Sequence, residues 1–109
     1  MINGNALTRD YWIVPLPARL MQWAARIAHR RTPLTAGQRT TGHDHKFLSF
    51  YFVNGIKFLR TRRGDVPLPD RAMVIVFPFS MHSWSNREGG ATGFVYDLTP
   101  AHRPHALEV

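Results

Sequence analysis

The sequence predicts an all-β domain of the sandwich or barrel class. Short runs of β-branched and aromatic residues recur along the chain, and turns rich in glycine or proline separate them. A helical spacing of apolar residues occurs within 19–31, but this segment also contains an alternating set of apolar residues, as in a strand. Short strands joined by tight turns are typical of two packed antiparallel sheets or of a barrel.

Length and composition indicate one domain. The 109 residues are 44% hydrophobic, which suffices for a single core but leaves no room for a second. The chain has no cysteine, so disulfides and thiolate metal ligands are excluded.

The charge of the chain is strongly positive but scattered. The formal net charge is +7, and only Arg60–Arg63 and Arg30–Arg31 form basic clusters. We interpret both clusters as solvated turns rather than as a nucleic-acid patch, since no aromatic residue lies within them. The longest apolar run, 72–79, is too short to span a bilayer, and no leader pattern precedes residue 18. We therefore expect a cytoplasmic protein that binds neither nucleic acid nor membrane.

The N-terminal third is expected to frame the domain. Residues 1–18 indicate an extended arm that docks through Tyr11 and Trp12 and ends at a proline corner. Residues 19–31 are a strand or a short helix, and a polar connection over 32–42 follows.

The strongest local signal is a hairpin. The runs 48–53 and 56–60 flank Asn54-Gly55, the pair most favourable for a type I′ turn. A two-residue turn would set Val53 opposite Ile56, Tyr51 opposite Phe58 and Ser49 opposite Arg60. The other face would carry four apolar residues, Leu48, Phe50, Phe52 and Leu59, which we expect the arm or a second subunit to cover.

The second half predicts further strands. Proline restricts 66–69 to an edge strand, and Met73–Phe77 indicates a central strand buried on both faces. Alternation resumes at His82 and Trp84, and the last strand covers 94–98.

Three histidines are candidates for a shared site. His43 and His45 project to one side of a strand because they are two residues apart, and His82 is the third. Three converging imidazoles would suit one divalent transition metal ion with water in the open position. Alternatively, the histidines are hydrogen-bonding residues that line a pocket or lie at strand ends.

A small-molecule pocket is the second candidate site. Tyr51, Phe58 and Trp84 could stack on a sugar or another small ligand, while Ser49 and Arg60 supply polar contacts. Ordinary core packing is the alternative for the aromatic residues. The ligand-binding candidates are therefore His43, His45, Ser49, Tyr51, Arg60, His82 and Trp84.

The order of these motifs resembles the small cupin domains, especially the sensor domains of AraC-type transcription regulators. The resemblance covers about residues 40 to 100. It includes His43-Asp44-His45 and Gly55 of the first cupin motif, with Ser49 where a glutamate is expected. In the second motif only His82 and Asn86 agree, but the segment from Val66 to Trp84 keeps the regulators' spacing.

The resemblance implies a cupin-type jelly-roll β-barrel with an N-terminal arm. It divides the chain into an arm with a first strand or short helix at 1–31, the barrel at 32–100 and a flexible tail at 101–109. The implied function is a small-molecule-binding sensor and dimerisation module, or a free-standing relative, that forms a homodimer. The alternative is a small metal-dependent cupin enzyme of the isomerase or dioxygenase type, whose metal ligands would be His43, His45 and His82.

Overall fold

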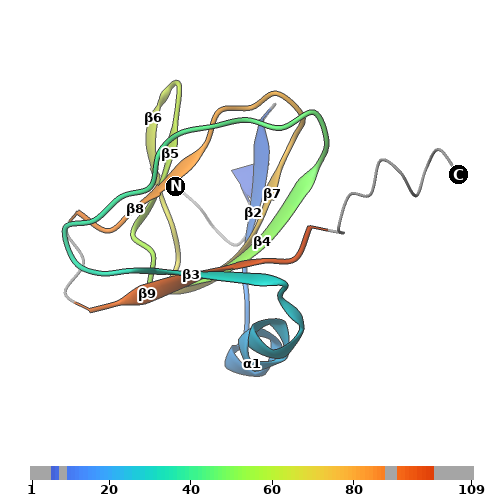
Figure 1. Cartoon of the computed structure of the whole chain (residues 1–109), viewed down its shortest axis with the longest axis vertical. Coiled ribbons are helices and arrows are strands. Elements are labelled where there is room, and N and C mark those ends of the chain that lie inside the picture. Colours follow the sequence, from blue (N-terminus) through green and yellow to red (C-terminus); the bar gives the residue numbers. More distant parts are fainter. Residues whose placement is uncertain (1–5, 8–9, 88–90, 100–109) are drawn as a thin grey trace, which may run out of the picture.

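The computed structural model, which describes residues 6–7, 10–87 and 91–99, contains two antiparallel sheets (Figure 1). The larger sheet has six strands in the order β1-β2-β7-β4-β9-β3, and the smaller has three in the order β6-β5-β8. The elements are β1 (Ala6–Leu7), β2 (Tyr11–Pro15), α1 (Ala18–Ile27), β3 (Arg30–Leu34), β4 (Ser49–Asn54), β5 (Phe58–Thr61), β6 (Gly64–Pro67), β7 (Arg71–Val76), β8 (Ser83–Ser85) and β9 (Gly93–Asp97).

The all-β class is confirmed, but the described residues form no closed barrel. The jelly-roll arrangement therefore stays a prediction. The main core lies between the inner faces of the two sheets, because side chains at alternate strand positions share one face. Its buried residues are Tyr11, Ile13, Leu34, Tyr51, Val53, Ile56, Leu59, Ala72, Val74, Val76, Trp84 and Val95.

The ambiguous segment after the proline corner is a helix. α1 follows Pro17 and packs Met21 and Ala24 on the outer face of the larger sheet, against Phe52 and Tyr96. The Trp23 ring lies 6.0 Å from the Phe52 ring. This segment forms a helix rather than a strand because the larger sheet has an apolar outer face that an amphipathic helix can cover.

The predicted hairpin at Asn54-Gly55 is wrong. β4 pairs with β7 and β9, whereas β5 pairs with β6 and β8, so none of the three expected cross-strand pairs forms. A type I′ turn needs positive φ at both central residues, and here Gly55 has φ 74° while Asn54 does not. The Gly55 N–H donates to the Asp70 carbonyl at 2.8 Å. The glycine thus forms a corner at which the chain leaves one sheet for the other.

Because of this corner, Leu59 lies on the face opposite to the predicted one. Leu59 is fully buried in the core between the sheets, not on the outer face with Phe50 and Phe52. Leu48 is exposed, at 41% of its surface.

The strands of the second half lie close to their predicted positions, but the burial of their residues differs from the prediction. β7 is central, between β2 and β4, but only alternate residues of its apolar run, Ala72, Val74 and Val76, are fully buried. Met73 and Ile75 are half-buried on the outer face, so burial on both faces is wrong. The proline-containing strand β6 is at an edge, as predicted.

The N-terminal segment contributes to the larger sheet. Residues of β2 pair with β7 along its whole length; Tyr11 is buried, and Trp12 is 37% exposed. The expected tail at 101–109 lies outside the described residues. Within the described part of the chain, no helix is both long and apolar enough to cross a membrane.

Candidate metal centre

The structure brings His43, His45 and His82 together, and we call these three residues the histidine cluster. His43 and His82 form an isolated antiparallel bridge: each backbone N–H donates to the other's carbonyl, at 3.1 Å and 2.9 Å. Ring centroids lie 4.3 Å apart for His43 and His82, 4.7 Å for His43 and His45, and 5.4 Å for His45 and His82. One ligand atom from each residue lies within 4.8 Å of the other two.

His82 is the fixed member of the histidine cluster. It is fully buried, and its Nδ1 lies 3.1 Å from the Ser80 carbonyl oxygen. A carbonyl only accepts, so Nδ1 carries the proton and Nε2 keeps the lone pair. Burial is the main cause that lowers the pKa of His82 from 6.5 to about 4. The residue is therefore neutral, which is the form that binds metals.

The other two histidines have more room. His43 is exposed, and its Nδ1 lies 3.2 Å from the Thr41 carbonyl, which again leaves Nε2 free. His45 is half-buried and stacks on Phe47 with ring centroids 5.2 Å apart. Burial first, and the nearby His43 second, lower the pKa of His45. Backbone carbonyls that hold Nδ1 are a common way to orient metal-binding imidazoles.

A strained turn positions two members of the cluster. Phe79 is the one described non-glycine residue with positive φ, at 62°. Its N–H donates to the His45 carbonyl at 2.6 Å, and the next residue, Ser80, supplies the carbonyl that orients His82. The strain at Phe79 thus lies where the backbone fixes both histidines.

The residues fit a metal ion after a modest contraction. In a tetrahedral site, zinc–nitrogen bonds of about 2.0–2.1 Å place the ligand nitrogens about 3.3 Å apart. In the structure, the three candidate ligand atoms lie within 4.8 Å of one another. His43 and His45 can close this difference because neither is buried. Three nitrogen ligands would leave one position open, as in catalytic zinc sites.

Tyr51 competes with a metal for one ligand atom. Its hydroxyl lies 3.2 Å from Nε2 of His82, and it donates because that nitrogen holds the lone pair. Burial is the main cause that raises the pKa of Tyr51 to about 12, so the phenol stays protonated. A metal ion at Nε2 would displace this hydrogen bond.

A pocket of about 210 Å³ adjoins the cluster, and we call it the histidine pocket. It includes Tyr51 and Trp84, whose rings meet edge to face at 5.1 Å, as well as His43 and His45. The complete lining is Arg30, Thr32, Thr40, His43, His45, Tyr51, Trp84, Val95 and Asp97.

Four sequence candidates do not line this pocket, and one of them is His82, which belongs to the histidine cluster. Arg60 lies in the smaller sheet and pairs with Asp65 at 3.3 Å. Phe58 is half-buried in the same strand. Ser49 is buried at the start of β4 and lies outside the lining.

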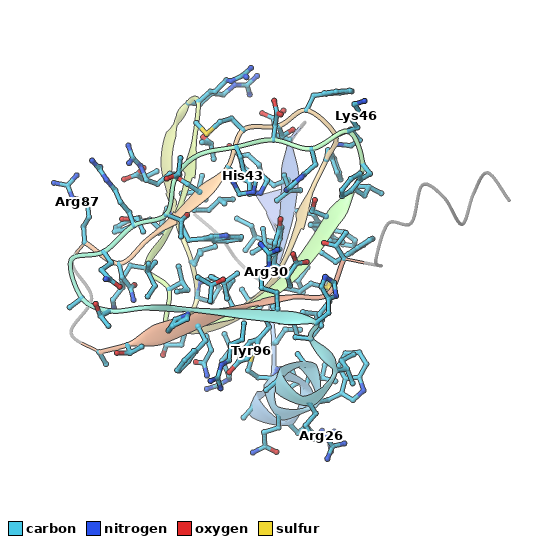
Figure 2. The ribbon with its side chains drawn as sticks, in the orientation of Figure 1. Arg26, Arg30, His43, Lys46, Arg87 and Tyr96 are labelled. Atoms are coloured by element: carbon cyan, nitrogen blue, oxygen red, sulfur yellow. The ribbon has the colours of Figure 1, made fainter. Side chains whose placement is uncertain are left out.

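The two charged pocket residues, Arg30 and Asp97, were not among the sequence candidates. They face each other across β3 and β9, and Asp97 also pairs with Tyr51 across β9 and β4. Figure 2 shows Arg30 and His43 on the same side of β3, opposite Tyr96. Strand alternation with Val95 would have placed Asp97 inside, whereas Arg30 was taken for part of a solvated turn.

Comparisons with protein-family models, with curated proteins and with solved structures find no match for this chain. The candidate site therefore rests on its own geometry, and the cupin resemblance remains an interpretation of the motifs.

Proposed function

We propose that this chain binds a divalent transition metal ion through the histidine cluster and a small molecule in the histidine pocket beside it. The observation that carries the proposal is the set of three convergent imidazoles, two of which are oriented by backbone carbonyls through Nδ1. The buried His82 needs such a partner in any case, but the exposed His43 does not, and metal ligands generally have one.

A small-molecule-binding role agrees with the shape of the site. The histidine pocket combines aromatic walls from Tyr51 and Trp84 with a few polar groups, as ligand sites usually do. It lies beside the histidine cluster, so a bound molecule could reach the open metal position. Such a module would serve as the sensor part of an AraC-type regulator or as a free-standing relative.

A metal-dependent enzyme is the second candidate. Its support is the carboxylate of Asp97 in the lining of the same pocket, because a carboxylate beside a metal-bound molecule can accept a proton. A sensor returns its ligand unchanged, whereas an enzyme alters it. Mass spectrometry of a ligand recovered from the metal-loaded protein distinguishes the two.

Metal titration tests the proposal. Chelator-treated protein titrated with zinc in a calorimeter should bind one equivalent, and His43→Ala should weaken binding by about a hundredfold or more because a direct ligand is lost. His43 is exposed, so its removal leaves the core intact. His29→Ala is the matched control, since His29 is an exposed histidine outside the cluster.

Two results would refute the metal site. One is a wild-type protein that takes up no stoichiometric zinc. The other is His43→Ala protein with unchanged zinc affinity and an unchanged melting temperature.

A further inference from the structure

We infer that the histidine pocket takes a small molecule bearing a carboxylate, which Arg30 binds while a second oxygen of the molecule reaches the metal. The inference rests on the proposed metal site and names its ligand class.

Arg30 lines the pocket and, among the described residues, forms no ion pair. It lines the pocket from β3, and no carboxylate of the described residues lies within 4.0 Å of its guanidinium. Its cross-strand neighbour Asp97 is engaged elsewhere: Oδ1 accepts the Thr99 N–H at 2.9 Å and lies 3.9 Å from Nε2 of His29. The planar guanidinium fork matches a carboxylate in two parallel hydrogen bonds.

The charge of the loaded site also favours an anion. Imidazoles are neutral ligands, so they cancel none of the charge of a divalent ion. Asp97 is the only acidic residue among the described residues of the lining. With Arg30 added, the loaded pocket stays positive, and an anionic ligand would compensate that charge.

The size and walls of the pocket limit the ligand further. About 210 Å³ is below the roughly 300–1,000 Å³ typical of sites for drug-sized molecules. Tyr51, Trp84 and Val95 offer apolar surface, while Thr32 and Thr40 offer hydroxyls. A short carbon chain ending in a carboxylate fits this combination.

Calorimetry with dicarboxylates tests the inference. Zinc-loaded protein is titrated with malonate, succinate and glutarate, each compared with its neutral diamide, after the zinc content has been measured. At least one dicarboxylate should bind about tenfold or more tightly than its diamide. Arg30→Gln should weaken that preference without changing the zinc content, whereas Arg31→Gln should retain it in full. Arg31 is the matched control because it is the next residue of β3, lies outside the pocket lining and stacks over Phe94 at 5.1 Å.

Each other outcome overturns a defined part of the proposal. Full zinc content with no preference for any dicarboxylate overturns the anion site and leaves the metal site standing. Equal effects of Arg30→Gln and Arg31→Gln show that overall charge, not the pocket, attracts the anion. Protein that takes up no zinc overturns the proposed function and this inference together.

Discussion

At the residue scale, the candidate site depends on one rigid and two adjustable histidines. His82 is buried and oriented on both sides of its ring, by Ser80 through Nδ1 and by Tyr51 through Nε2. His43 and His45 belong to the connection that precedes β4 and are less buried. A metal ion would therefore recruit the two adjustable ligands to the fixed one, and Tyr51 would have to release His82.

Tyr51→Phe tests this competition. Removing the hydroxyl leaves Nε2 of His82 without its donor, which should cost the metal-free protein about 1–3 kcal/mol of unfolding free energy. The same change should raise the affinity for zinc about three- to tenfold, because zinc no longer has to displace the Tyr51 hydrogen bond, worth about 1 kcal/mol, from Nε2 of His82. Chemical denaturation and zinc calorimetry measure the two effects. Weaker zinc binding by Tyr51→Phe would instead make the phenol a support of the metal, contrary to this competition.

The sequence predicted the histidine cluster because its signal is local and chemical. Two histidines at a spacing of two residues share a side of an extended chain, and His82 was the third candidate, on a strand predicted from alternation. Arg30 could not be found in this way. It reaches the pocket only because β3 pairs with β9, a contact between residues far apart in the chain.

At the element scale, the corner at Gly55 decides the fold. Local preference favours a tight turn at Asn54-Gly55, but β4 finds two partners, β7 and β9, and a hairpin would have replaced one of them with β5. Tertiary pairing thus overrides the local turn signal. The positions of β4, β7, the edge strand and the last strand follow from residue pattern, whereas β3 lies where the sequence predicted a turn and a polar connection. Strand partners depend on contacts that no local pattern records.

A close glycine pair makes this corner possible. A Cβ built on Gly93 would lie 2.5 Å from the Gly55 carbonyl carbon and 2.7 Å from the Asn54 carbonyl oxygen. Both are backbone atoms, which cannot rotate away as a side chain can. The chain crosses between the sheets here only because β9 presents a residue without a side chain.

Gly93→Ala should therefore lower the free energy of unfolding by about 3 kcal/mol or more, through overpacking against backbone. Gly37→Ala is the control, since Gly37 has φ 85° but a Cβ at that position would have no neighbouring atom within 4 Å. That change should cost only about 1–2 kcal/mol. Denaturant unfolding of both variants measures the difference. A Gly93→Ala loss no larger than the Gly37→Ala loss would disprove the close packing at the corner.

At the scale of the whole molecule, both sheets contribute residues to the candidate site. The larger sheet supplies Tyr51, Arg30 and Asp97 from adjacent strands, while β8 and the residues before it supply Trp84 and His82. The core between the sheets holds these elements in register. The all-β class was predictable from strand and turn patterns, but the pocket was only partly predictable, because four strands from the two sheets, β3, β4, β9 and β8, must meet to form it.

The central claim is that one metal ion is bound by these three imidazoles. X-ray absorption at the zinc edge of the loaded protein tests it most directly, because imidazole rings give a distinctive outer-shell signal and zinc–nitrogen bonds of about 2.0–2.1 Å. We expect three imidazoles for the wild type and two for His45→Asn, with His29→Asn unchanged. Coordination by oxygen alone, or the same imidazole number in His45→Asn as in the wild type, would contradict it.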